Sequence, residues 1–204
     1  MFIRYIQTNP WFFFSWIFVI ILSICVHEFA HAFVALKRGD DTAARQGHLS
    51  LNPLVQMGPT SLFMLAIIGV AWGAVPINPA RYRTRGDAAL VAFAGPAANL
   101  LLAVAFGVLA LLLRGAPVAA DTCVLGCQAN GVLFVLNMLP VPMLDGWSVF
   151  SMFFPALERV TPQQAQTVSL VALMLIFVSP LGDFVWSAGL ALGGVWLRVL
   201  GVVG

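Results

Sequence analysis

The sequence predicts an all-α integral membrane protein, a polytopic helical bundle of about five spans that forms one domain over residues 1–204. Of its 204 residues, 61% are hydrophobic and only 9% are charged. A soluble domain carries about 25% charged residues, so most of this surface faces lipid rather than water. The net charge of +2 is too small to indicate a nucleic-acid partner.

Long apolar runs define the expected spans in chain order. The first, residues 11–36, would extend about 39 Å as a helix at about 1.5 Å per residue, which exceeds the hydrocarbon thickness of about 30 Å. The later runs cover residues 88–113, 128–144, 167–178 and 184–203. We expect a catalytic core over about 11–150 and C-terminal apolar helices over about 166–203, which form either one span or two.

The short apolar segment 61–76 is interrupted by Gly and Pro, and positive charge indicates its path. If it crossed the membrane, the basic residues before and after it would lie on opposite faces. If it dips in and returns, one face receives Lys37, Arg38, Arg45, Arg81, Arg83, Arg85 and Arg159, and the other only Arg4 and Arg114. Basic loops prefer the cytoplasm. We therefore expect a re-entrant segment, a loop or a β-hairpin, with both of its ends in the cytoplasm.

The first span contains the pattern H-E-x-x-H at His27, Glu28 and His31. His27 and His31 are one helical turn apart, so both imidazoles can reach one Zn²⁺. Glu28 points about 100° away from His27, where it can accept a proton from an activated water without ligating the metal. A charged group in mid-span costs about 2.5–3.5 kcal/mol, so chance placement is a poor explanation.

Tetrahedral zinc needs a third protein ligand, and Asp145 is the candidate. It follows an apolar run that Pro140 and Pro142 interrupt, and Gly146 allows the backbone to turn there. In the re-entrant topology this run and the first span have the same direction, so Asp145 arrives at the depth of the histidines. The alternative is an interfacial carboxylate that caps a turn.

Two amide side chains are the other polar groups expected near this site. Asn137 and Asn99 could bind an oxyanion or hold an extended substrate backbone, or each could make a hydrogen bond that only packs the helices together. Cys123 and Cys127 are assigned to a short loop, where they either pair or remain free thiols.

Together, these motifs resemble the site-2 protease family of intramembrane zinc metalloproteases. They are H-E-x-x-H in the first span, A-G-P-A-A-N over 94–99, and N-x-x-P-x-P-x-L-D-G over 137–146. The stretches G-H-L-S-L-N-P over 47–53 and W-G-A-V-P-I-N-P over 72–79 are similar to its short prokaryotic members. The resemblance implies one zinc ion per chain held by His27, His31 and Asp145, with Glu28 as the general base. It also implies a three-helix core and a transmembrane segment of another protein as substrate.

The chain departs from the family pattern at three positions. Trp147 follows the Asp-Gly pair where a small residue is usual, and Gln56 and Met57 stand where short members often have His and Asp. None of these positions is a predicted ligand. We expect no PDZ or CBS module, so that regulation would come from a membrane partner.

The expected function is therefore hydrolysis of peptide bonds within transmembrane segments, at a site towards the cytoplasmic side of the cell membrane. A zinc transporter is the alternative from another class, but it would show repeat symmetry and polar residues along a crossing path. A catalytically inactive scaffold would be favoured only if Glu28 or a ligand were missing.

Overall fold

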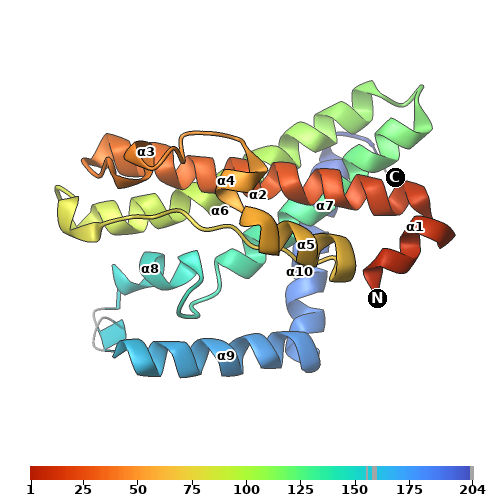
Figure 1. The fold of residues 1–204 in the computed structure, drawn as a ribbon. Helices are drawn as coiled ribbons and strands as arrows, with labels where there is room; N and C mark the ends of the chain where they lie inside the picture. The colour runs from red at the N-terminus through yellow and green to blue at the C-terminus, as the bar shows by residue number, and fades with distance from the viewer. Residues whose placement is uncertain (155, 158–159, 203–204) are drawn as a thin grey trace.

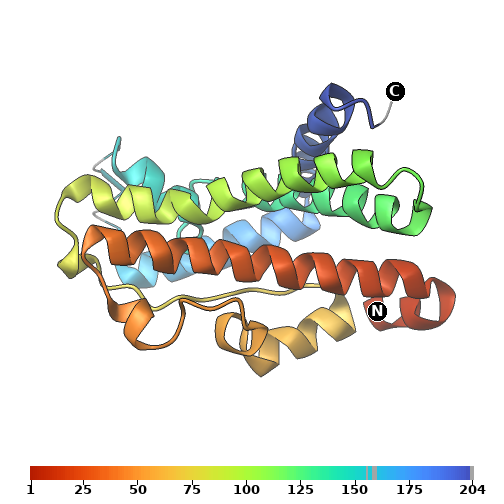
Figure 2. The same cartoon turned by 90° about the horizontal axis from the view of Figure 1, so that it is seen from above.

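Three long apolar helices lie side by side in the computed structural model, which describes residues 1–154, 156–157 and 160–202 (Figures 1 and 2). They are α2 (Pro10–Arg38), α6 (Arg85–Leu112) and α7 (Pro117–Asn137). Each is long and apolar enough to cross a bilayer, so the chain is a multi-pass membrane protein. The short elements η1 (Phe2–Arg4) and α1 (Tyr5–Thr8) fold back at the start of α2.

Local sequence signals set the ends of these helices. The side chain of Asn9 accepts a hydrogen bond from the N–H of Phe12 and caps α2, which ends at Gly39 with φ +108°. Thr84 and Asp87 form a capping box at the start of α6. Helices α2 and α6 thus begin and end near the edges of the apolar runs 11–36 and 88–113, as the sequence predicts.

The segment between α2 and α6 leaves one end of α2 and returns to it. It contains α3 (Thr42–Arg45), α4 (Pro53–Gln56) and α5 (Gly58–Ile68), followed by extended chain and η2 (Pro79–Arg81). Figure 2 shows α5 running along α2 towards the N-terminus and the extended chain running back. The described residues contain no strand, so the β-hairpin form of the expectation is not observed.

Hydrogen bonds attach the extended chain, residues 69–78, along its length. The indole N–H of Trp16 donates to the Gly69 carbonyl at 2.9 Å, and the hydroxyl of Ser61 bonds both the N–H and the carbonyl of Trp72. The carboxylate of Asp40 accepts the N–H of Asn78 at 2.6 Å. Both ends of the segment are thereby held at the C-terminal end of α2.

The C-terminal part contains α8 (Asp145–Ser151), α9 (Pro162–Val178) and α10 (Pro180–Val199). The axes of α9 and α10 meet at 76°, and counting them as one broken span brings the candidate spans among the described residues from three to at most four. The five predicted spans are therefore not reproduced. Glycines allow α10 to cross α7 closely, since a Cβ at Gly189 would lie 2.7 Å from a methyl carbon of Val132.

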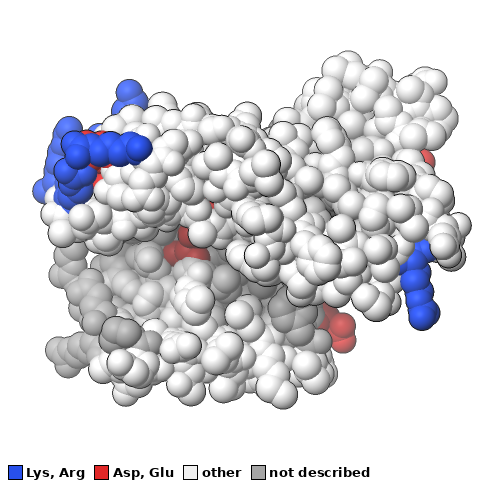
Figure 3. Space-filling view, in the orientation of Figure 1, with Lys and Arg blue, Asp and Glu red and all other residues white. Residues whose placement is uncertain are grey.

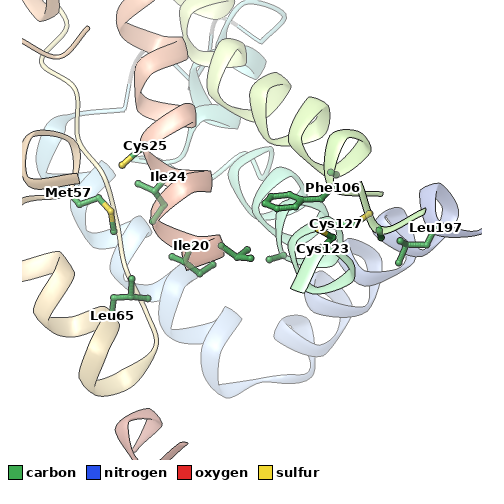
Figure 4. Close-up of a cluster of buried hydrophobic side chains, with 13 residues drawn as sticks. Ile20, Ile24, Cys25, Met57, Leu65, Phe106, Cys123, Cys127 and Leu197 are labelled. Atoms are coloured by element: carbon green, nitrogen blue, oxygen red, sulfur yellow. The ribbon is translucent and has the colours of Figure 1, made fainter. Parts of the chain in front are cut away.

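The placement of Cys123 and Cys127 in a short loop is wrong, and of the two states left open for them the structure has the free thiols. Both lie inside α7, which begins at Pro117 rather than near residue 128, and both are buried free thiols. They belong to a hydrophobic cluster with Ile20, Phe106 and Leu197 that joins α2, α5, α6, α7 and α10 (Figure 4). Helix α7 continues through both cysteines and packs against α2, α6 and α10.

Basic side chains gather at one end of the molecule, over α3 and the adjoining ends of α2 and α6 (Figure 3). Arg45 and Arg81 pair with Asp41 there, and Arg38 pairs with Asp87. Burial disfavours the charge of neighbouring Asp40, but hydrogen bonds from Asn78 and Thr42 outweigh it and lower the pKa of that carboxyl. This charged end holds the two polar ends of the segment between α2 and α6.

Candidate metal centre

Helix α2 presents the two predicted histidine ligands from one face. His27, Glu28 and His31 are each only 8% exposed, although they lie within an apolar helix. The two imidazole rings are 4.6 Å apart between centroids, and their Nε2 atoms are 3.0 Å apart. The spacing of one turn therefore brings two ring nitrogens to the same point, as the motif predicts.

A third potential ligand comes from a distant part of the chain. Asp145 is the first residue of α8, and its carboxylate oxygens lie 3.1 Å from His27 Nε2 and 3.3 Å from His31 Nε2. One ligand atom from each of the three residues lies within 4.8 Å of the others. Two imidazole nitrogens and one carboxylate oxygen are a common zinc ligand set.

The irregular segment after α7 brings Asp145 to this position. Met143 has φ +71°, an unusual value for a residue other than glycine, and Leu144 is extended. Gly146 packs so closely against the carbonyl groups of Met138 and Leu139 that a side chain would not fit. Pro140 and Pro142 prevent α7 from continuing, and Gly146 allows α8 to start close to the end of α7.

The hydrogen bonds behind the rings indicate that a cation fits between them. His31 Nδ1 lies 2.7 Å from the carbonyl oxygen of Val91, which can only accept, so that nitrogen carries the proton. In a neutral ring, His31 Nε2 then directs a lone pair at the centre. Asp145 Oδ2 is buried and accepts no hydrogen bond from the described residues. Lone pairs that converge in this way repel one another unless a cation binds them.

A glycine on α6 leaves the room that such an ion needs. A Cβ at Gly95 would lie 2.5 Å from His27 Nε2, and it would also overlap His31 Nε2. Gly73, in the extended chain, faces Glu28 in the same way, because its Cβ would lie 2.5 Å from Cγ of that residue. A glycine therefore lies against each part of the site: Gly95 against the two histidines and Gly73 against the carboxylate of Glu28.

A cavity of about 600 Å³ contains this group. Its wall includes Glu28, Asn137, Trp147 and Leu173, together with residues of the extended chain. Figure 3 shows a hollow between the bundle and the α9 side of the molecule with acidic atoms inside it. The site is large enough to admit several residues of a peptide chain as well as water.

Comparison with known proteins identifies the family. The chain matches the model of peptidase family M50 over residues 15–124. It belongs to peptidase family M50. Its relatives include "Putative zinc metalloprotease YwhC" of Bacillus subtilis, 35% identical over 180 residues that cover 83% of this chain and 82% of YwhC. Another relative, "Putative zinc metalloprotease Rip2" of Mycolicibacterium smegmatis, is 33% identical over 79% of this chain and 66% of Rip2. No solved structure matches the chain significantly.

Membership of family M50 confirms the resemblance to the site-2 proteases that the motifs indicate, and with it the prediction of a membrane peptidase. The matched range contains His27, Glu28, His31 and Asn99 but ends before Asp145. The case for Asp145 in this M50 peptidase therefore rests on its position beside the two histidines.

The two predicted amides both line the cavity but differ in burial and in their hydrogen bonds. Asn137 lines the cavity and donates to the Leu133 carbonyl at 3.0 Å, which leaves its amide oxygen available. Asn99 is fully buried, and its amide contacts His27 Nδ1 at 2.6 Å and Asn130 at 2.9 Å. Its hydrogen bonds are thus made within the protein, beside the candidate ligand His27.

Sequence reasoning missed four residues at this site: Gly73, Gly95, Ser23 and Asn130. The two glycines matter because they lack a Cβ that would overlap Glu28 or the histidines. The sequence does not show that they face these residues. Ser23 stands one turn before His27, and Asn130 is an amide inside an apolar helix. The cost of burying an amide in a membrane span was the signal that could have indicated Asn130.

Proposed function

We propose that this chain is a zinc-dependent endopeptidase that cleaves peptide bonds within transmembrane segments of other membrane proteins. One zinc ion per chain would be held by His27, His31 and Asp145. The observation that carries the proposal is the meeting of these three groups, within 4.8 Å of one another, in a membrane helix bundle and beside Glu28. The names of the relatives support zinc as the metal.

A zinc ion in this position supplies a positive charge that polarises a peptide carbonyl and makes water more acidic. Glu28 accepts the proton of the attacking water and passes it to the leaving amine. Glu28 suits this role because it shares the cavity with the ligand group, while Gly73 leaves space over its side chain. The amide of Asn137 faces the same cavity and hydrogen-bonds the substrate backbone or its developing oxyanion.

The substrate class follows from where the site lies. His27 and His31 lie inside α2, which is long and apolar enough to span the membrane, so a substrate that reaches them comes from within the bilayer. A transmembrane helix has its own backbone hydrogen bonds and must unwind locally before a carbonyl can reach the centre. The cavity wall contains extended chain that can border such an unwound segment. A membrane partner that controls this access would regulate the enzyme.

The orientation of the enzyme follows from its charge. The re-entrant arrangement of the segment between α2 and α6 is supported by the return of that segment to the end of α2 where it began. Basic side chains gather at the same end, and the positive-inside rule assigns that end to the cytoplasm. His31 is nearer to this end of α2 than to the other, so water would enter from the cytoplasmic side.

The direct test is cleavage by purified protein in proteoliposomes. Single-span model substrates with helix-destabilising residues at different depths would be incubated with the zinc-loaded enzyme and their fragments identified by mass spectrometry. We expect cuts within the span, loss of activity with a zinc chelator and recovery when zinc is added back. Zinc flux across the vesicle membrane without cleavage would instead identify a transporter and refute the proposal.

A further inference from the structure

A line of buried polar side chains leads from the metal centre into the helix bundle. His27 Nδ1 contacts Asn99 Oδ1 at 2.6 Å, Asn99 Nδ2 donates to Asn130 Oδ1 at 2.9 Å, and Asn130 Nδ2 donates to Ser23 Oγ at 2.9 Å. Asn99, Asn130 and Ser23 come from α6, α7 and α2 and have no exposed surface. Four polar groups from three candidate spans therefore form one connected path.

The direction of every hydrogen bond in this path is set at its far end. The amide of Asn130 also contacts the carbonyl of Gly126, and the Ser23 hydroxyl contacts the carbonyl of Val19. Carbonyl oxygens can only accept, so Asn130 must turn its NH₂ group towards Gly126 and Ser23. Its oxygen then faces Asn99 and accepts from the NH₂ group of that residue.

The orientation of Asn99 decides the state of His27. Because the NH₂ group of Asn99 is used by Asn130, its oxygen faces His27 Nδ1, and that nitrogen must donate. In the neutral ring the proton is then on Nδ1, and Nε2 presents a lone pair at the position where the metal would bind. The reverse orientation of Asn99 would place two acceptor oxygens opposite each other at Asn130.

The two histidines differ in the acceptor that holds the proton on Nδ1. His31 Nδ1 donates to a backbone carbonyl, that of Val91, which is present whatever the side chains are. His27 Nδ1 faces a side-chain amide, whose oxygen and nitrogen ends can exchange by a half-turn. The sequence must therefore supply further residues to hold that amide in one orientation.

We propose that Asn130 and Ser23 are positioning residues that act through Asn99 to hold His27 with its Nδ1 protonated and its Nε2 directed at the metal. The proposal rests on the metal centre of the proposed function. Partners of this kind behind a metal ligand typically change metal affinity by about 10- to 100-fold when they are removed. Asn130 touches neither metal nor substrate in this scheme.

The test compares variants that remove hydrogen bonds from the same helices. Asn130→Ala removes the group that orients Asn99, and Ser23→Ala removes one of the two groups that orient Asn130. The matched control is Thr122→Val, which breaks the 2.9 Å hydrogen bond between Thr122 on α7 and Ser15 on α2 and leaves the path intact. Three measurements are made on each purified full-length protein: zinc affinity by competition with a chelator, the visible spectrum after loading with Co²⁺, and the melting temperature without metal.

We expect zinc affinity to fall about 10-fold or more in Asn130→Ala and by less in Ser23→Ala, with an altered Co²⁺ spectrum in Asn130→Ala. Thr122→Val should bind zinc as the wild type does, even if its melting temperature falls. An Asn130→Ala protein with a lower melting temperature but wild-type zinc affinity and Co²⁺ spectrum would show that the path only packs the helices. Equal weakening in Thr122→Val would also overturn the proposal. A wild-type protein that binds no zinc would overturn the proposed function itself.

Discussion

Gly95→Ala tests the metal centre most directly, because it adds one methyl group at the position where the ligands converge. The added Cβ would lie 2.5 Å from His27 Nε2, whereas ordinary contacts begin at 3.4 Å, so the imidazole would have to move by roughly 0.9 Å. Functional metal sites keep their coordination distances within about 0.2 Å. The methyl group therefore cannot be accommodated without loss of at least one ligand.

The expected magnitude can be derived from this displacement. Misplacement of a catalytic group by about 1 Å costs about 100-fold in rate, and we expect at least that loss of cleavage. Zinc content at a chelator concentration that leaves the wild type loaded should fall well below one ion per chain. Overpacking costs about 1–3 kcal/mol of folding free energy, so the variant should still insert and fold with a lower melting temperature.

The matched control is Gly86→Ala in the same helix. A Cβ at Gly86 has only ordinary contacts, with its nearest neighbour, Cε of Met152, at 3.8 Å. This variant should retain both zinc and activity. If Gly95→Ala retained one zinc per chain and the wild-type cleavage rate, the ligands would not meet beside α6, and the geometry of the centre described above would be wrong.

Three further predictions concern the roles and the topology. Glu28→Gln should abolish cleavage and leave about one zinc per chain, because in the proposed site Glu28 is the base and not a ligand. Loss of zinc together with activity would make it a ligand or a structural group. Asp145→Asn replaces an anionic oxygen by a weaker neutral donor and should reduce both zinc content and cleavage, whereas full zinc content would leave the third ligand unidentified. Single cysteines near Arg45 and near Arg83, in a background without the native cysteines, should be labelled from one membrane face and a cysteine near Arg114 from the other. Labelling of the first two from opposite faces would refute the re-entrant topology.

The histidine pair could be predicted from the sequence because its geometry is local. His27 and His31 lie on one helix, where a separation of four residues always places side chains on the same face. The apolar composition of the first span and the caps at its ends are local as well. Membrane location, the first span and the family could all be inferred from such signals.

The role of Asp145 was predicted from the sequence, but its contacts depend on the tertiary structure. The sequence predicted its role from the direction of the spans, which is a coarse argument about depth. Its contact with both histidines depends on the bent backbone at Met143 and on the close packing of Gly146 beneath α7. The contacts of Asp145 with the two histidines join residues more than 100 positions apart, and hydropathy carries no information about them.

The wrong placement of Cys123 and Cys127 in a loop has a related cause. Asp121, Thr122 and Gln128 interrupt the apolar pattern, and the sequence alone makes such an interruption look like a loop. In the tertiary structure α7 packs against α2, α6 and α10, and Thr122 bonds Ser15 of α2 while Asp121 stays exposed, so the helix continues. Hydropathy measures the preference for lipid, whereas a helix inside a bundle faces protein.

Tertiary structure alone decided what surrounds the ligands. The sequence leaves Asn99 open as a substrate contact or as a packing residue, and only the packing of α7 brings Asn130 against it and connects it to Ser23. The sequence determines which chemical groups the chain carries and how those on one helix are spaced. Which groups from different helices meet depends on how the helices pack, because hydrogen bonds and steric exclusion act over a few ångströms between segments far apart in the chain.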